Sequence, residues 1–477
     1  MTKNYQKFRP RILFVSSLIV FIWVGLSLRL VKIMVFDSSY YRKIGFNQSQ
    51  KQEPLKAVRG NIFDRNQVQL TKNIIHYSIG AHPKKILKKE ELSETLSNIT
   101  GRDAEIYFNK LSSNRPFVTL EPKIKRELGE KVLENLPDLI VERKSRRSYP
   151  HSNIASQVIG FTNTDDSGLV GIERQFEEYL SGKDGWIVKQ VNVAGKTGSF
   201  HKANYPKQDP DDGSNIQLTI DLEYQSILQE ELQRRIDESG AKGAMGILMD
   251  PQNGDILAMA SLPDFDLNNP NITPLENQKN KVITDQFEPG STFKIVAATA
   301  ALNTGKVSLN DEFNCEVGKF EFDGWTISDH EKFGVLTFPQ IIANSSNVGV
   351  IKIAQIIGKE PLYRLSRNYG FGTPTGISFP GESQGILRQK KDWSKMSLAS
   401  VSIGYEVGVT ALQIASAYSA IANGGVLLKP QIVRQIISNK GELLYKSKPE
   451  PIRKVVKAET MLIMKEILSK VINEGTG

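Results

Sequence analysis

The apolar positions of the chain begin with one long run near the N-terminus. Ile12–Leu28 reads ILFVSSLIVFIWVGLSL without a charge, and the apolar stretch continues to Phe36 across Arg29 and Lys32. A membrane-spanning helix needs about 20 apolar residues, and long basic side chains can reach the bilayer surface. The pattern therefore predicts a transmembrane anchor over residues 12–36.

The charges around this run predict its orientation. Four basic residues lie between positions 3 and 11, and the first acidic residue is Asp37. An excess of basic residues marks the cytoplasmic side, so residues 1–11 are predicted to be a cytoplasmic tail and the bulk of the chain extracytoplasmic. A cleaved signal peptide and a buried helix are the alternatives. No A-x-A-like cleavage site follows the run, which favours an uncleaved anchor.

Residues 37–210 contain short apolar segments, some with the two-residue period of a strand and some with the 3.6-residue period of a helix. Val58–Asn66 alternates like a strand that leads into a hairpin, and Phe117–Leu120 is a second strand candidate. Lys123–Leu136 has the pattern of an amphipathic helix. The polar stretch 203–215, rich in Pro and Asp, suggests a domain boundary. We expect a mixed α/β domain here, with an internal ion-pair network of Arg59, Asp64 and Arg147.

Residues 211–477 read as a second domain, a sheet flanked by a helical lobe. The segments 216–220, 243–250 and 255–260 have strand patterns, and the last two flank a Pro-Gln-Asn-Gly turn, as in a β-hairpin. Helices are predicted at Leu222–Ile236, Pro339–Ile357, Glu360–Tyr369 and Ala411–Asn423, and a strand at Val426–Ile437. The fold class is therefore α+β and multi-domain.

The composition of the chain limits the functions and kinds of site that it can have. The chain is 39% hydrophobic and 24% charged, with a net charge of +9. Its basic residues are scattered without a basic, aromatic-interleaved stripe, which argues against nucleic-acid binding; a nearby anionic membrane or wall polymer explains the charge equally well. Cys315 is the single cysteine and the five histidines are dispersed, so we expect no disulfide, metal or cofactor, and a core position for Cys315.

The candidate chemistry lies at Gln286–Lys294, QFEPGSTFK, ahead of a run of helix-forming residues. Pro-Gly makes a turn, so a helix should begin at about Ser291, where free N–H groups favour negative charge. Lys294 lies one turn further on the same face. Burial can lower its pKa until it accepts the serine proton. Ser291 and Lys294 are therefore a candidate nucleophile and base.

A second candidate motif, S-x-N, begins about fifty residues later at Ser345 and ends at Asn347. On a loop between helices, the two side chains can point into one cleft, where the hydroxyl relays a proton and the amide binds a substrate amide. Each motif is weak alone. S-x-x-K recurs at Ser199/Lys202 and Ser239/Lys242, S-x-N recurs at Ser112/Asn114, and capping or solvated side chains are the plain alternative.

The order of these motifs matches that of penicillin-recognising serine enzymes, S-x-x-K, then S-x-N, then K-T-G. Over nearly its whole length the chain resembles the class B penicillin-binding proteins, which are membrane-anchored peptidoglycan transpeptidases. Three segments resemble the pedestal signatures of that family: RGNIFDRN at 59–66, RSYP at 147–150 and GIE at 171–173. The segment SIGYEV at 402–407 looks more like the division-type (FtsI-like) branch than the elongation type.

The resemblance implies a D-Ala-D-Ala transpeptidase with a pedestal domain at 37–210 and a transpeptidase domain at 211–477. Ser291 would form the acyl-enzyme, Lys294 would be the base, and Ser345 and Asn347 would assist proton transfer and substrate placement. The implied partners are peptidoglycan stem peptides, β-lactams, the inner membrane, a membrane-embedded glycan polymerase and other division proteins at the septum.

The third motif departs from the family pattern. The family places K-T-G after S-x-N, whereas Lys196-Thr197-Gly198 precedes the nucleophile, and we interpret it as a surface loop. The final residues 474–477 resemble the segment shortly before the K-T-G strand. We therefore expect an incomplete transpeptidase domain and poor activity, because one lost oxyanion donor typically costs about a hundred- to a thousand-fold in rate.

Other functions remain open at this point. A non-catalytic scaffold of the division machinery would use the anchor and pedestal and keep Ser291 as a relic, and an elongation-type transpeptidase would share the same chemistry. A β-lactamase needs neither an anchor nor a pedestal. A penicillin sensor usually carries a signalling domain, which the sequence does not reveal.

Overall fold

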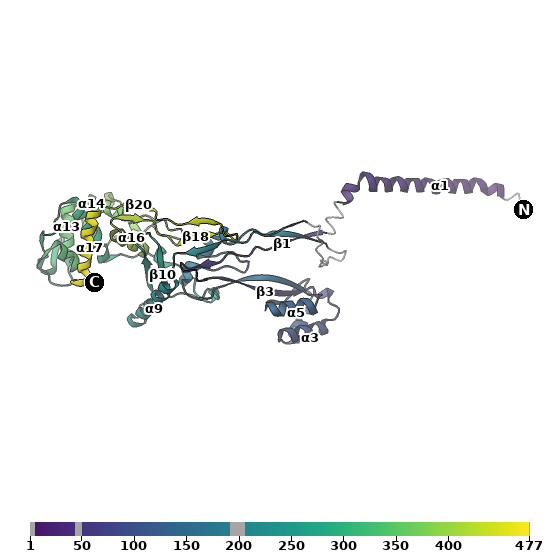
Figure 1. The fold of residues 1–477 in the computed structure, drawn as a ribbon, viewed down its shortest axis with the longest axis horizontal. Helices are drawn as coiled ribbons and strands as arrows, with labels where there is room; N and C mark the ends of the chain where they lie inside the picture. Colours follow the sequence, from purple (N-terminus) through teal and green to yellow (C-terminus); the bar gives the residue numbers. More distant parts are fainter. Residues whose placement is uncertain (1–4, 43–49, 191–205, 477) are drawn as a thin grey trace. The chain divides into compact units, whose positions relative to one another are not determined.

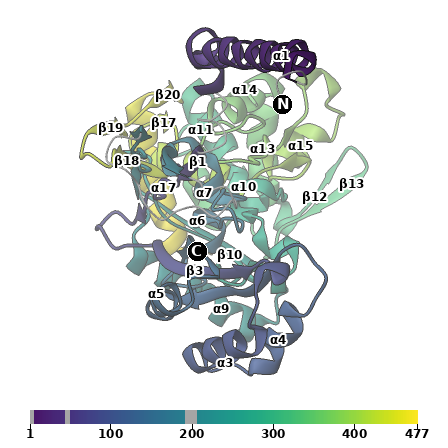
Figure 2. The ribbon, with the colours of Figure 1, turned by 90° about the vertical axis from the view of Figure 1, so that its right-hand side faces the viewer.

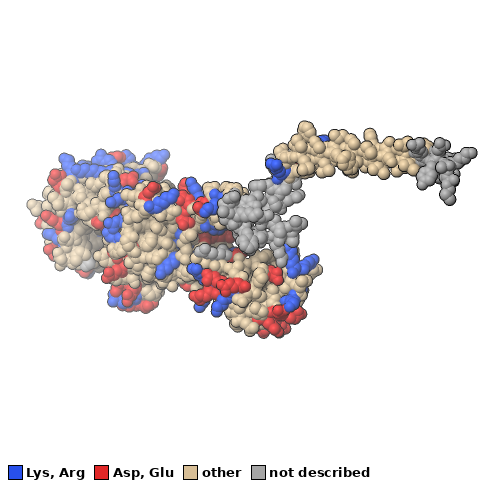
Figure 3. Space-filling model, turned by 45° about the vertical axis from the view of Figure 1, so that its right-hand side comes forward, with Lys and Arg blue, Asp and Glu red and all other residues tan. Residues whose placement is uncertain are grey.

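The computed structural model describes residues 5–42, 50–190 and 206–476. Its first helix, α1 (Tyr5–Val31), continues into the π-helical turn η1 (Lys32–Phe36), and Figure 3 shows the surface of its described side chains as mostly uncharged. The stretch Pro10–Phe36 is long and apolar enough to cross a bilayer, which fits the predicted single-pass anchor. Lys196-Thr197-Gly198 and the Ser199/Lys202 pair lie outside the described residues.

The chain divides into two compact units. The first unit, residues 1–57 with 183–212, contains α1 and an antiparallel sheet of three strands in the order β1-β6-β7. These strands are β1 (Gln50–Leu55), β6 (Gly185–Gln190) and β7 (Lys207–Gln208).

The second unit, residues 58–182 with 213–477, contains three hydrophobic cores. One core lies between the sheet β4-β3-β5 and three helices, and it buries Tyr107 and Leu120 completely. The predicted strand near 117–120 and helix near 123–136 are confirmed as β4 and α5. The elements are β3 (Lys72–Ala81), β4 (Val118–Lys125), β5 (Ile140–Ser148), α3 (Lys89–Thr100), α4 (Ala104–Leu111) and α5 (Arg126–Asn135).

The next core surrounds a sheet in the order β19-β18-β8-β2, in which Ile62 of β2 pairs in parallel with Ile216 of β8. Residues before and after the predicted border near residue 210 share this core, and the border itself stays a prediction. The predicted hairpin is confirmed as β9–β10, against which α9 packs. The elements are β2 (Ile62–Phe63), β8 (Asn215–Leu218), β18 (Val433–Ile437), β19 (Leu443–Lys446), α9 (Leu222–Ser239), β9 (Ala244–Met249) and β10 (Ile256–Leu262).

The third core is the helical lobe, whose central helix α11 is buried from Lys294 to Ala301. Helices α13, α14 and α17 pack against α11, and Figure 2 shows the β12–β13 hairpin extending from this lobe. The helices are α11 (Lys294–Thr304), α12 (Phe338–Ala343), α13 (Asn347–Ile357), α14 (Lys359–Asn368), α15 (Ser397–Ser402), α16 (Ala411–Ala422) and α17 (Ala458–Asn473). The strands of the hairpin are β12 (Lys319–Phe322) and β13 (Trp325–Ser328).

The second unit also contains shorter elements, of which Figure 1 labels β20. They are α6 (Ser156–Ile159), α7 (Gly171–Gln175), α8 (Glu177–Leu180), α10 (Lys281–Thr284), β11 (Glu312–Asn314), β14 (Val335–Thr337), β15 (Ile386–Leu387), β16 (Val407–Gly408), β17 (Val426–Leu428) and β20 (Pro451–Lys454).

Two predicted elements are wrong because the backbone turns inside them. The single helix Pro339–Ile357 is two helices, α12 and α13, since Ser345 adopts a left-handed conformation with φ of 52°. The single strand Val426–Ile437 is split into β17, which pairs with β20, and β18, which pairs with β8. Pro430 lies in the gap between these strands, where its missing N–H breaks no ladder.

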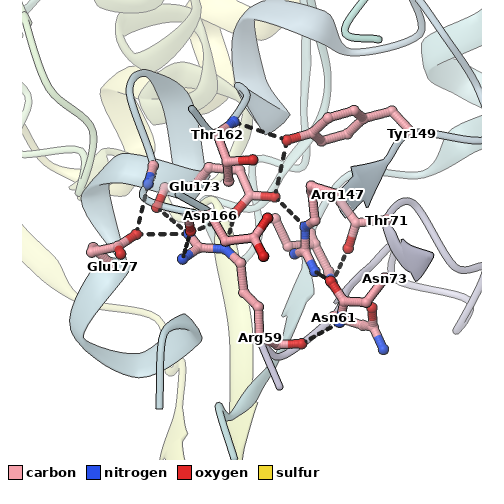
Figure 4. A network of polar contacts seen from close by, with 12 residues as sticks. Arg59, Asn61, Thr71, Asn73, Arg147, Tyr149, Thr162, Asp166, Glu173 and Glu177 are labelled. Atoms are coloured by element: carbon pink, nitrogen blue, oxygen red, sulfur yellow. Dashed lines mark hydrogen bonds and ion pairs between the residues drawn. The ribbon is translucent and has the colours of Figure 1, made fainter. Parts of the chain in front are cut away.

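A buried ion network joins segments that are distant in sequence (Figure 4). Glu173 binds Arg59 through one carboxylate oxygen and Arg147 through the other, each at 2.7 Å, and the three side chains are at most 3% exposed. Glu177 also binds Arg59 at 2.7 Å. The two arginines of the predicted network are confirmed, but Asp64 is not its acid. The Asp64 carboxylate instead accepts backbone N–H bonds from Asn66, Val68 and Leu222.

Replacing Glu173 by Ala should destabilise the protein strongly, because Arg59 and Arg147 would stay buried with their shared partner removed. Breaking a buried ion pair by removing one partner costs about 3–5 kcal/mol. We expect a clear drop in the thermal unfolding midpoint. Glu178→Ala, at an exposed position on the neighbouring helix, is the control and should leave the midpoint nearly unchanged; equal midpoints for both variants would contradict a stabilising network.

Candidate active site

The sequence around Ser291 folds as one tight turn that leads into a buried helix. Gly290–Phe293 is a 3-10 turn, and α11 starts at Lys294. Ser291 and Thr292 are exposed, whereas Phe293 and Lys294 are buried. The predicted helix start near Ser291 is thus confirmed, with a 3-10 turn as its first step. This arrangement leaves the serine hydroxyl accessible and carries the lysine side chain inward.

Lys294 is a cation in an apolar core. The residue is only 2% exposed. Its amine donates to the Ser345 hydroxyl at 3.0 Å and to the Ser345 carbonyl at 2.5 Å. Burial lowers the pKa of Lys294 to about 8, and the negative charge of Asp329 acts in the opposite direction. A substantial fraction of the amine is therefore neutral near pH 8 and able to accept a proton.

Ser345 lies on the turn between α12 and α13, and Asn347 is the first residue of α13. The left-handed backbone of Ser345 turns its side chain toward Lys294, while the buried Ser346 caps α13 by accepting from the backbone N–H of Gly349 at 2.9 Å. The Asn347 amide donates to the carbonyl of Ser328 at 3.0 Å. The loop position predicted for this motif is confirmed for Ser345, whereas Asn347 begins the next helix.

The Asp329 carboxylate binds the residues that follow Ser345 at the start of α13. One oxygen of its carboxylate accepts from the backbone N–H groups of Asn347 and Val348, at 2.5 and 3.0 Å. The other oxygen accepts from the Ser346 hydroxyl at 2.7 Å. Asp329 follows β13 and lies well before the turn in sequence, so its contribution comes from the tertiary fold.

Residues 404–409 make backbone hydrogen bonds to the segment that precedes Ser291. Gly404 accepts from the backbone N–H of Gly290 at 3.1 Å, and Phe287 exchanges two backbone hydrogen bonds of 3.0 Å with Val409. A Cβ on Gly404 would lie 2.1 Å from the Gly290 carbonyl oxygen, so only glycine fits there. The hydroxyl of Tyr418 on α16 donates to the Thr292 carbonyl at 3.0 Å. The turn is thus fixed at both of its ends.

Of the four predicted site residues, Lys294 and Ser345 are in direct contact, and Asn347 begins the helix that follows Ser345. The Ser291 hydroxyl makes no hydrogen bond to these three within the described residues, and such bonds are often loose before substrate binds. Sequence reasoning missed Asp329 and Tyr418. No periodicity or spacing pointed to Asp329, because its partners lie on a different element.

Comparison with known proteins agrees with this geometry. The family model described as the penicillin binding protein transpeptidase domain matches residues 244–477, and that of the penicillin-binding protein dimerisation domain matches residues 54–218. The chain is 32% identical over 433 residues to the probable peptidoglycan D,D-transpeptidase PbpC of Pseudomonas aeruginosa, covering 90% of this chain and 76% of that protein. The chain belongs to the class B penicillin-binding proteins.

Two further relatives extend the comparison. This penicillin-binding protein is 29% identical over 406 residues to the peptidoglycan D,D-transpeptidase FtsI of Escherichia coli, covering 83% of this chain and 68% of that protein. Its fold is similar to the crystal structure of penicillin binding protein 3 from Mycobacterium tuberculosis in complex with aztreonam. The TM-score is 0.65 at 26% identity, over 88% of this chain and 76% of that chain.

Replacing Gly404 by Ala should displace the turn that carries Ser291, because the new methyl group would overlap the Gly290 backbone. We expect a lower thermal unfolding midpoint and slower labelling by fluorescent penicillin. Gly424→Ala is the matched control, since Gly424 has a similar positive φ but nothing within 4 Å of an added Cβ. The control measures the conformational cost alone, about 1–2 kcal/mol. Equal losses in both variants would show that the close approach to Gly290 is unimportant.

Proposed function

We propose that this class B penicillin-binding protein is a serine-type peptidoglycan D,D-transpeptidase that cross-links stem peptides during septal wall synthesis through an acyl-enzyme on Ser291. The observation that carries the proposal is the buried Lys294 amine. Its lowered pKa, its bond to Ser345 and its position one turn from the exposed Ser291 suit it to accept the proton of a serine nucleophile.

In the first step the Ser291 hydroxyl attacks the carbonyl of the penultimate D-Ala of a donor stem peptide. The serine proton passes to Lys294, and the negative charge on the carbonyl oxygen is stabilised by the backbone N–H of Ser291. The bond between the two D-Ala residues then breaks. The leaving amine takes a proton through Ser345, and free D-Ala departs while the donor remains as an ester on Ser291.

In the second step an amine of a neighbouring stem peptide attacks this ester. The amine gives up a proton to the Lys294–Ser345 pair, an amide bond forms, and Ser291 regains its hydroxyl. Asn347 binds the peptide amide of the substrate. A β-lactam acylates Ser291 in the same way as the first step, its ring amide standing in for the D-Ala-D-Ala bond.

Fluorescent penicillin tests the nucleophile directly. Ser291→Ala should abolish the covalent band, whereas Ser239→Ala, the serine of another S-x-x-K match, should keep it. The protein is labelled in membranes of cells that express its gene. Persistence of the band in Ser291→Ala would refute the proposed nucleophile. Normal growth of cells whose only copy carries Ser291→Ala would favour the scaffold function instead.

The septal role is supported by the similarity to FtsI and by the SIGYEV segment at 402–407. The apolar helix α1, with basic residues ahead of it, supports an anchor whose N-terminus is cytoplasmic. By this proposal the domains contact a membrane-embedded glycan polymerase and other division proteins.

A fluorescent fusion should therefore concentrate at midcell, and depletion of the protein should give filamentous cells. A fusion of the anchor, residues 1–42, to the same fluorescent protein is the control for general membrane staining. Sidewall localisation with rounded cells after depletion would favour an elongation-type enzyme.

A further inference from the structure

Asp329 stands at the base of the β12–β13 hairpin, and that base is rigid. The backbone N–H of Asp329 donates to the Gly318 carbonyl at 3.0 Å, which closes the hairpin. Gly318 has φ of +80°, and a Cβ there would lie 2.5 Å from the Glu331 carbonyl oxygen. The backbone of Asp329 is therefore held by the hairpin, and its carboxylate makes its hydrogen bonds to the S-x-N turn.

The end of β13 holds the S-x-N turn by both its main chain and a side chain. Asp329 binds the N–H groups of Asn347 and Val348, and the neighbouring Ser328 carbonyl accepts from the Asn347 amide. A carboxylate at the N-terminus of a helix is favourable because it satisfies free N–H groups and interacts with the dipole. Both the backbone and the Asn347 side chain at the start of α13 are thus bound to the end of the β12–β13 hairpin.

The turn needs such support because Ser345 occupies a left-handed conformation, with φ of 52°. Residues other than glycine keep this conformation only where their surroundings impose it. Ser345 itself donates its backbone N–H to the Ile342 carbonyl at 3.1 Å, and the Lys294 amine donates to its hydroxyl and its carbonyl. Loss of the support would allow the Ser345 hydroxyl to leave the amine.

We propose that Asp329 is a positioning residue of the acyl-transfer site, whose carboxylate keeps the Ser345–Asn347 turn in the conformation that places the Ser345 hydroxyl on the Lys294 amine. This inference rests on the proposed function of Ser291 and Lys294. Asp329 acts through the turn and is not a catalytic residue.

The carboxylate has a second effect that a purely structural residue would not have. Within the described residues, Asp329 is the charged group that acts on the Lys294 amine, and it raises the pKa of Lys294 against the larger effect of burial. Removing its charge therefore lowers the pKa of Lys294. Because acylation requires the neutral amine, the acidic limb of the rate profile should move to lower pH.

Asp329→Asn tests both effects. Asparagine has nearly the same shape and keeps one oxygen for the backbone N–H groups, but it loses the charge and places an NH₂ group toward the Ser346 hydroxyl. The matched control is Asp323→Asn, at the exposed turn of the same hairpin, where φ is 47°; asparagine tolerates that backbone. The experiment measures the rate of penicillin acylation between pH 6 and 10 and the thermal unfolding midpoint, on the membrane protein expressed from its gene.

For the unaltered protein and for Asp323→Asn, the rate should rise with pH to a half-maximum near the Lys294 pKa of about 8. For Asp329→Asn, we expect acylation about ten- to a hundredfold slower at the plateau and a half-maximum at lower pH. An unchanged rate and profile would overturn the positioning role. A slower rate with an unmoved profile, accompanied by a lower unfolding midpoint, would overturn it too, because that result indicates a structural residue only.

The same experiment separates this inference from the proposed function. Labelling that disappears in Ser291→Ala but is unaffected by Asp329→Asn overturns only the role of Asp329. Labelling that persists in Ser291→Ala overturns both.

Discussion

The structure of the candidate site depends on one buried amine. Lys294 begins a helix whose first eight residues are buried, so its cation has left water for an apolar core. Desolvation favours the neutral form, and the Ser345 hydroxyl and carbonyl supply hydrogen bonds that compensate for lost water. The same burial that is unfavourable for a charged lysine lowers its pKa, and the proposed mechanism uses the resulting neutral amine as the base for Ser291. By that proposal, the desolvation of Lys294 is the physical origin of its reactivity.

The amine can work only if the segments around it stay in place, and each is held by a contact from elsewhere in the chain. The turn of Ser291 is fixed by Gly404 and by the Tyr418 hydroxyl, and the S-x-N turn by Asp329. Backbone carbonyls and N–H groups make most of these contacts. They depend on close approach, which explains why a glycine is required at position 404.

A different kind of interaction holds the part of the second unit around β2 and β5. There Glu173 binds Arg59 and Arg147 in a nearly water-free network (Figure 4). Charged groups so deep in a protein are tolerated only when they are paired with opposite charges. The three residues come from three separate signatures of the sequence, so the network ties distant segments together near the sheet in which β2 pairs with β8.

The sequence by itself determined the apolar N-terminal helix, the family, several of the longer helices and the two motifs, because these depend on local patterns of apolar residues and on short spacings. It also indicated the turn before Ser291, since Pro-Gly restricts the backbone locally. Only the tertiary structure decided where the helix near Ser345 breaks, which acid partners Arg59 and Arg147, and that Asp329 binds the S-x-N turn. The polar residues 344–347 permit a break but do not fix the left-handed backbone of Ser345, and Arg59 finds its buried acid 114 residues away in the sequence. Hydrogen bonds of that kind leave no periodic trace in a single sequence, because they are specified by distance in space and not by distance along the chain.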